Sequence, residues 1–279
     1  MKKAFTIALL CTAVSSLSYA EESVTTDSMS NGNTEENTMT NAVSLENFTF
    51  DRYVDGLNAS ITPKGRVALQ QALPTANYYE QKVDGQTHKI TTLQTDSLVR
   101  IGIGHEAEVR VGWQGLQWQR NKTCSLQHDE NHIGDMSVAI KKRLLNDSDM
   151  QWSVLAQADL ATGSSYEHRP CRDKYSVISA VDYQYSELIQ TAITMKYDYQ
   201  KGDLGFTTVP SIRYKLTDHA KGYFEYVGHK QESQKSTSQV NHGILFNYHN
   251  KAQFDMWFGY GFNDVMPRYR AGLGVSYLF

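Results

Sequence analysis

The final strand-length stretch of the chain, which ends in a terminal phenylalanine, constrains the fold most strongly. Alternate residues from 269 to 279 are apolar or aromatic, and those between them are mostly small or charged. Alternation with a period of two places one set of side chains on each face of a β-strand. One face therefore suits lipid, as in the closing strand of a bacterial outer-membrane β-barrel, where Tyr277 and Phe279 would form the C-terminal signal for the barrel-assembly machinery. The alternative is a soluble edge strand that ends in phenylalanine by chance.

The first 20 residues have the pattern of a cleaved secretory signal peptide. Lys2 and Lys3 precede an apolar stretch, and a small-x-small cleavage site ends at Ala20. Cys11 is not preceded by the small residue that lipid attachment requires, so we expect no lipid anchor. No later run reaches about 18 consecutive apolar residues, which excludes helical membrane spans.

The remaining chain divides into a tail and a barrel. Residues 21–62 are predicted to form an acidic, largely disordered periplasmic tail, because the stretch 21–45 has too few apolar side chains to offset the entropy of ordering. The stretch from 47 to 65 carries several aromatic residues. It either docks into the mouth of the barrel or is a plain linker, and the sequence leaves both open. The barrel itself is predicted over 63–279.

About twelve alternating segments separated by turn residues follow, as expected for a transmembrane barrel. Pro74 and Pro210 fall within two of these segments, where each removes a ladder donor, so we expect β-bulges there. The approximate spans are 65–81, 87–103, 107–120, 134–146, 149–162, 174–186, 188–200, 203–216, 219–230, 237–249, 251–263 and 266–279.

The connections between these segments give an independent test of the barrel. If both ends of the chain are periplasmic, every second connection should be a short periplasmic turn. Long connections fall only in the other, extracellular set, which includes 121–133, 163–173 and 229–237. The short set is 104–107, 146–149, 185–188, 216–220 and 249–251.

The predicted lumen face is rich in charged residues. Charges in a barrel interior must be paired or hydrated. They line a water-filled solute pathway or form a salt-bridge network that fills the interior, and twelve strands lie between the packed and the open limits of barrel size. The lumen-lining candidates are Arg100, Arg110, Asp135, Lys141, Asp159, Asp182, Lys196, Arg213, Lys215, Glu225, Asp255, Arg268 and Arg270.

Two cysteines remain after cleavage, Cys124 and Cys171, and both lie in predicted outer loops. An exported protein can form disulfides, so we expect one disulfide between them. Nearby histidines and acidic residues match no specific metal motif, and we expect neither a metal nor a cofactor. The chain lacks a clustered basic face, which argues against nucleic-acid binding.

An enzyme that acts on membrane lipid is a further alternative. Such outer-membrane enzymes carry a histidine and a serine in a short recognisable arrangement. His229 with Ser233 and His242 are the nearest candidates, and neither has the flanking residues of those enzymes. We therefore expect no catalytic activity.

Four stretches carry a resemblance to a known family: 133–145, 156–164, 222–229 and 254–279. They resemble, in order, a Gly-Asp-initiated strand with a basic end, a strand ending in a Thr-Gly turn, an aromatic-Glu-aromatic strand and a closing hairpin. In these features the chain is similar to the outer-membrane transporter family named after the MetA pathway of phenol degradation. The resemblance implies an outer-membrane barrel that moves small, often aromatic, organic compounds, and it brings no catalytic residues.

The sequence therefore predicts an all-β protein, a transmembrane antiparallel up-and-down β-barrel of about twelve strands in the outer membrane of a Gram-negative bacterium. The expected function is a passive, porin-like channel for small solutes, with outer-membrane lipid and the assembly machinery as further partners. The alternative is a closed barrel with a structural or surface-binding role through its extracellular loops.

Overall fold

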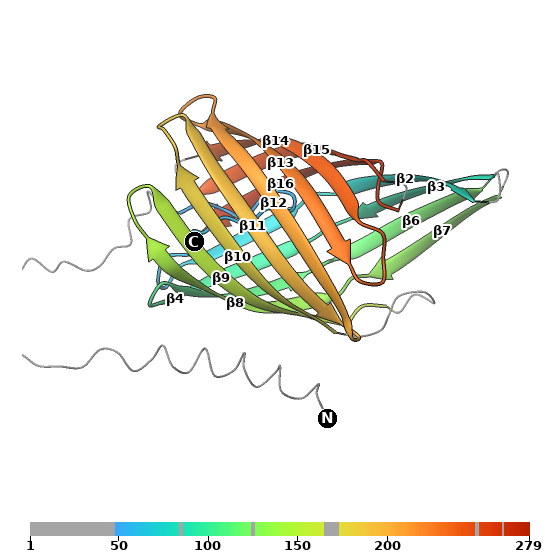
Figure 1. Ribbon diagram of the computed structural model, residues 1–279, viewed down its shortest axis with the longest axis horizontal. Coiled ribbons are helices and arrows are strands. Elements are labelled where there is room, and N and C mark those ends of the chain that lie inside the picture. The colour runs from blue at the N-terminus through green and yellow to red at the C-terminus, as the bar shows by residue number, and fades with distance from the viewer. Residues whose placement is uncertain (1–47, 84–85, 124–125, 165–172, 249–250, 264) are drawn as a thin grey trace, which may run out of the picture. The chain divides into compact units, whose positions relative to one another are not determined.

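The computed structural model describes residues 48–279, apart from 84–85, 124–125, 165–172, 249–250 and 264. This part of the chain consists of β-strands, turns and loops (Figure 1), and it holds no helix that is long and apolar enough to cross a membrane. The predictions of a signal peptide and of disorder before residue 48 concern residues outside this range.

Twelve antiparallel strands close into a barrel, which confirms the predicted fold class. Ala68 of the first strand pairs with Leu278 of the last, so the ring has no open edge. In ring order the strands are β1 (Val67–Ala72), β4 (Ser97–Gly104), β5 (Ala107–Trp113), β8 (Met136–Asn146), β9 (Met150–Leu160), β10 (Lys174–Gln184), β11 (Ile189–Gln200), β12 (Asp203–Lys215), β13 (Ala220–Gln231), β14 (Thr237–Tyr248), β15 (Ala252–Gly261) and β16 (Tyr269–Leu278).

Side chains alternate between the two faces of the barrel wall as the sequence predicts. In β16, Gly274 and Leu278 are buried in the interior, whereas Leu273, Tyr277 and the following Phe279 are exposed on the outside. The other wall strands repeat this arrangement. A continuous outer surface of apolar and aromatic side chains is the pattern of a wall that faces lipid.

Four of the five predicted short connections are confirmed as tight turns at the rim that carries the C-terminus, and the fifth, 249–251, falls partly outside the described residues. His105 and Glu106, between β4 and β5, have φ angles of 51° and 56°. Positive φ at both central residues matches the right-handed twist of the strands that such a turn joins. The longer connections lie at the opposite rim.

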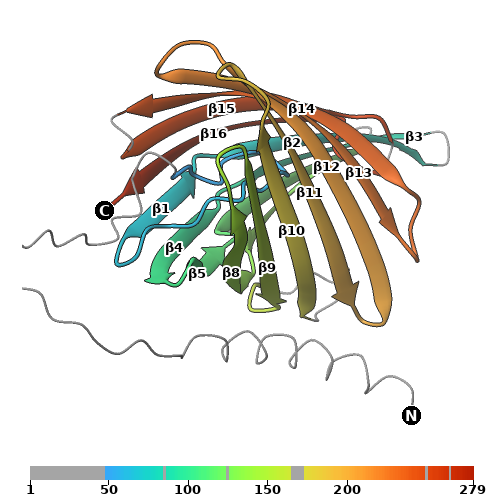
Figure 2. The same cartoon turned by 60° about the vertical axis from the view of Figure 1, so that its left-hand side comes forward.

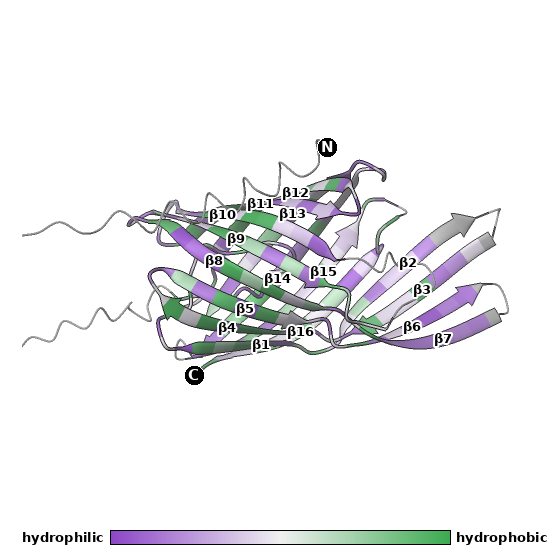
Figure 3. Cartoon of the chain, turned by 90° about the horizontal axis from the view of Figure 1, so that it is seen from below, coloured by the Kyte–Doolittle hydropathy of each residue, from purple (hydrophilic) through white to green (hydrophobic). Residues whose placement is uncertain are grey.

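Four additional strands extend the wall at this opposite rim: β2 (Thr75–Val83), β3 (Gln86–Gln94), β6 (Leu116–Thr123) and β7 (Leu126–Ile133). Each continues a wall strand across a short break, and together they form a four-stranded extension that projects from the barrel (Figure 1). Figure 3 shows that the extension is largely hydrophilic, unlike the green bands on the wall strands. It therefore lies beyond the lipid-facing band.

The extension overturns one sequence prediction. Much of the stretch 121–133 is strand rather than loop, because β6 and β7 pair from Leu116↔Ile133 to Thr123↔Leu126. Its side chains are polar on both faces, so no alternation of apolar and polar residues marks these strands.

The two prolines behave differently. Around Pro74, Ala72 pairs with Gly274 and Ala76 pairs with Ala271. The chain thus advances four positions where β16 advances three, and the one extra residue forms the predicted bulge. At Pro210 the predicted bulge is wrong. The β12–β13 register is the same at Thr208↔Gly228 and Ser211↔Glu225, and only the intervening pairs are missing.

Candidate functional site

The barrel interior contains a stretch of the chain's own N-terminal region, residues 48–63, which we call the lumen segment. Figure 2 shows it in blue, inside the ring of strands before the start of β1. Asn58, Ala59 and Thr62 are at most 1% exposed, and Phe50 is 4% exposed. Of the two alternatives left by the sequence, docking is therefore the observed one.

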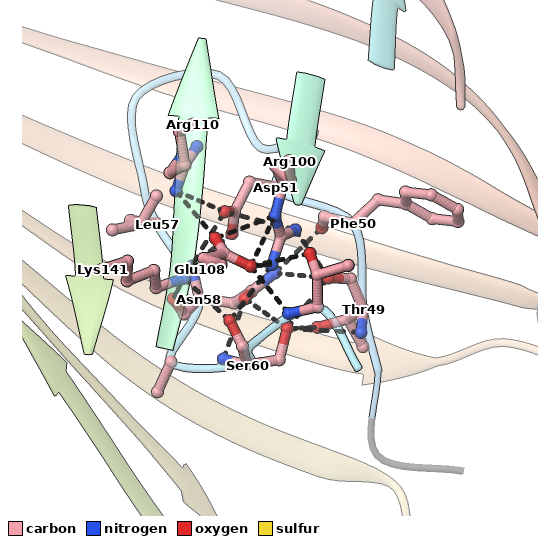
Figure 4. Close-up of polar contacts among 12 residues, drawn as sticks. Thr49, Phe50, Asp51, Leu57, Asn58, Ser60, Arg100, Glu108, Arg110 and Lys141 are labelled. Atoms are coloured by element: carbon pink, nitrogen blue, oxygen red, sulfur yellow. Dashed lines mark hydrogen bonds and ion pairs between the residues drawn. The ribbon is translucent and has the colours of Figure 1, made fainter. Parts of the chain in front are cut away.

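One side of the lumen holds the carboxylate of Asp51 within a group of charged side chains (Figure 4). This basic cluster consists of Arg100 on β4, Glu108 and Arg110 on β5, and Lys141 on β8. The Asp51 carboxylate lies 2.8 Å from an Arg110 nitrogen, 3.4 Å from Arg100 and 3.5 Å from Lys141. Glu108 pairs with Arg100 at 3.0 Å.

These cations determine the protonation state of Asp51. Burial alone would raise the pKa of its carboxyl, but Arg100, Lys141 and Arg110 outweigh burial and hold the pKa well below its ordinary value of 3.8. Because the pKa is lowered in the folded protein, the charged contacts stabilise the docked segment above the ordinary pKa. They are lost only as the pH falls below it toward the lowered value.

The basic cluster also binds the backbone of the lumen segment. Lys141 Nζ donates to the carbonyl oxygens of Asn58 (2.7 Å) and Ser60 (2.9 Å). The backbone N–H and the hydroxyl of Thr62 both donate to Glu108 Oε2 at 2.7 Å. Donors and acceptors of the wall thus satisfy backbone groups that would otherwise be buried without partners.

The other side of the lumen carries an acidic cluster: Asp182 on β10, Arg213 on β12, Glu225 on β13 and Asp255 on β15. Arg52 of the lumen segment donates to Asp255 at 3.1 and 3.2 Å. Asp182 accepts from the Ala59 N–H at 2.9 Å and pairs with Arg213 at 3.0 Å. Asp255 and Asp182 therefore each accept a hydrogen bond from a donor on the lumen segment, which sequence spacing alone would not reveal.

Glu225 accepts two backbone hydrogen bonds from the lumen segment, from the N–H of Asp55 (3.2 Å) and of Gly56 (3.0 Å). A Cβ atom added at Gly56 would clash with the Glu225 carboxylate. Glycine thus allows this close approach, because a larger residue would displace the Glu225 carboxylate from the two N–H groups that it accepts from.

Aromatic rings of the lumen segment contact guanidinium groups of the wall. The Arg213 guanidinium lies 4.0 Å from the centre of the Tyr53 ring, and Arg100 lies 5.1 Å from the centre of the Phe48 ring. Tyr53 also packs edge-on against the buried Tyr223 at 5.1 Å. Cation–π contacts of this kind are strongest where water is excluded.

The predicted lumen residues fall into two groups. Seven of them contact the lumen segment through hydrogen bonds or ion pairs: Arg100, Arg110, Lys141, Asp182, Arg213, Glu225 and Asp255. Arg270 joins them near the opposite rim, where it pairs with Asp55 at 3.1 Å.

The other five predicted residues lie away from the lumen segment. Asp159 pairs with Lys174, and Lys196 pairs with Asp198, on the inner face nearer the opposite rim. Asp135 accepts from the Gly163 N–H at a strand break. Lys215 pairs with Asp218 at a turn, and Arg268 is exposed in the β15–β16 connection.

The sequence analysis missed the partners on the lumen segment, Asp51 and Arg52 above all. The available signal was the set of aromatic residues Phe48, Phe50 and Tyr53 within an otherwise polar region. Cys124 and Cys171 lie outside the described residues, so the disulfide stays a prediction. No group of three or more potential metal ligands occurs among the residues that the structure describes.

The inner face of the extension has a different character. A groove of about 220 Å³ is lined mainly by amide, hydroxyl and aromatic side chains, among them Asn77, Tyr79, Thr92, Gln94 and Gln119. Asn77 donates to Thr92 at 3.0 Å, and Gln119 donates to Asn121 at 3.0 Å. These neutral side chains continue the face that carries the basic cluster in the barrel.

A profile of the family described as "Putative MetA-pathway of phenol degradation" matches residues 50–279, so the matched range includes most of the lumen segment. A search of curated proteins finds no match. Among solved structures, the COG4313 outer membrane channel from Pseudomonas putida F1 shares 12% identity over 81% of this chain and 100% of that chain, with a TM-score of 0.65. The KdgM porin shares 10% identity over 77% and 99%, with a TM-score of 0.50. At these identities the likeness is one of fold.

Proposed function

Because the chain belongs to the family described as "Putative MetA-pathway of phenol degradation", we propose that it is an outer-membrane channel for small solutes whose own lumen segment closes it. One observation carries this proposal: the charged side chains on both sides of the lumen bind the lumen segment and do not pair only with one another. A barrel whose charges served only to fill its interior would have no need of a separate stretch of chain among them.

The contacts of the segment also support aromatic compounds as solutes. Phe48 and Tyr53 lie against Arg100 and Arg213, so the interior already accommodates aromatic rings beside guanidinium groups. An aromatic solute would meet the same guanidinium groups once the segment leaves. The phenol pathway in the family's description is consistent with such a solute.

In this proposal the rim that carries the C-terminus faces the periplasm, and the extension faces the cell exterior. The tail before residue 48 then enters from the periplasm, and Tyr277 and Phe279 serve as the assembly signal. The exposed apolar wall contacts outer-membrane lipid. The proposed activity is transport without catalysis and requires no cofactor.

The test compares the full-length protein with the variant D51N/R52Q in planar bilayers. Asp51→Asn keeps the side-chain shape, Arg52→Gln keeps a polar side chain, and together they remove the charges by which the segment holds both clusters. We expect rare openings in the unmodified protein and frequent discrete conducting steps in the variant.

The matched control is R120Q/D129N, which removes an exposed pair of 3.0 Å between β6 and β7, outside the barrel. It should behave like the unmodified protein. If D51N/R52Q stays silent although heat-modifiable gel mobility shows a folded barrel, the channel function is wrong. The groove on the extension would then favour the second candidate, a surface-binding role.

A further inference from the structure

The lumen separates charge across its width. The basic cluster contains three cations and one acid, so its formal charge is 3 − 1 = +2. The acidic cluster contains one cation and three acids, so its formal charge is 1 − 3 = −2. The two clusters are therefore equal and opposite.

The strand order centres these clusters on opposite sides of the barrel. In the ring of twelve, the basic cluster occupies the second to fourth strands, β4, β5 and β8, and the acidic cluster extends from the sixth, β10, to the eleventh, β15. From β5, in the middle of the basic cluster, six steps lead to β13 with Glu225 on the opposite wall. A field therefore crosses the lumen from β5 toward β13, at right angles to the direction of passage.

The lumen segment has two consecutive residues of opposite charge, and each binds the cluster of the opposite sign. Asp51 binds the basic cluster, and the next residue, Arg52, binds Asp255 in the acidic cluster. Tyr53 then stacks on Arg213. The segment thus presents a carboxylate, a cation and an aromatic ring within three residues, each in contact with the wall group of complementary chemistry.

We propose that the lumen selects small zwitterionic solutes that carry an aromatic ring, and that the lumen segment occupies the site as an internal mimic of them. This inference rests on the proposed channel function and specifies its substrate class. An anion is attracted by the basic cluster but repelled by the acidic one, and a cation experiences the reverse. A zwitterion aligned across the lumen interacts favourably with both clusters, and its ring takes the place of Tyr53 beside Arg213.

The experiment uses the full-length D51N/R52Q variant in planar bilayers, in which the wall clusters are intact. Four probes share a phenyl ring and differ in charge: phenylalanine, 3-phenylpropanoate, phenethylamine and 2-phenylethanol. The measured quantity is the dwell time of each probe as it interrupts the current. We expect phenylalanine to dwell about tenfold longer than the singly charged probes, a ratio that corresponds to about 1.4 kcal/mol, and the neutral alcohol to dwell most briefly.

Adding Asp255→Asn tests the acidic cluster directly. This substitution should abolish the advantage of phenylalanine over 3-phenylpropanoate, while R120Q/D129N in the same background should preserve it. Equal dwell times for phenylalanine and the anion in the D51N/R52Q variant would overturn the inference, although conduction would still support a channel. The absence of any conducting steps would instead contradict the proposed function.

Discussion

The inner face of the barrel wall continues onto the strands of the extension, yet the chemistry of the two parts differs. In the wall, β4 and β5 present Arg100, Glu108 and Arg110. Across the strand breaks, β3 and β6 present Gln94 and Gln119 on the continuation of that face. On β3 and β6 the change from charged to neutral side chains coincides with the end of the region that holds the lumen segment, and only the neighbouring β7 places a carboxylate, Glu130, opposite Gln119 among the described residues of these strands.

The difference between the two inner faces indicates the role of the charged side chains in the barrel wall. A buried charge without a partner is costly, and the lumen segment supplies partners only inside the barrel. Amide side chains act as donors and acceptors without needing a counter-charge, so they suit the extension, where no segment lies. Inner-face charges near the segment therefore bind it, whereas those away from it pair with each other, as Asp159 does with Lys174.

The largest effect is expected from Asp51→Lys, which would add a fourth cation to the basic cluster. Breaking a buried ion pair costs about 3 kcal/mol or more, so the ratio of open to closed channels should rise about 100-fold or more. Planar-bilayer recordings measure this ratio.

Trypsin gives an independent readout of the same variant. It should cleave after Arg52 in the Asp51→Lys protein and spare this bond in the unmodified protein, where the Arg52 side chain is only 12% exposed. Persistent protection of Arg52 would mean that the basic cluster does not hold the segment.

A smaller effect is expected from Gly56→Val. The new side chain would clash with the Glu225 carboxylate and break two backbone hydrogen bonds. Overpacking of this kind costs about 1–3 kcal/mol, so the open probability should rise, but less than with Asp51→Lys. Gly205→Ala is the control, since its Cβ would have only ordinary contacts, the nearest at 3.4 Å. Equal behaviour of the two variants would contradict the close approach at Glu225.

Arg213→Lys tests the aromatic contact alone. A lysine keeps the positive charge beside Asp182 but loses the planar group that stacks on Tyr53. We expect a loss of about 1 kcal/mol, or roughly a fivefold rise in the ratio of open to closed channels. Arg120→Lys is the matched control, because Arg120 also stacks on an aromatic ring, Trp118, at 4.7 Å, but outside the lumen.

Much of the barrel could be predicted because lipid outside and a polar lumen inside impose alternation on every wall strand. The same alternation assigns Arg100, Lys141 and Arg213 to the interior face, where they lie. It could not reveal their partners, since Asp51 and Arg100 are 49 residues apart and no spacing rule connects them. Nor could it reveal β7, because water contacts both faces of the extension and removes the contrast between them.

The smallest effect should come from Q94A/Q119A in the groove of the extension. If only the wall groups that bind the lumen segment hold the channel closed, these neutral side chains do not contribute to the closed state. The open probability and the thermal stability should then change by less than about 0.5 kcal/mol. A rise in open probability as large as that of Arg213→Lys would break the comparison. It would mean that the neutral face of the extension also holds the channel closed, so that closure would not depend only on the wall groups that bind the lumen segment.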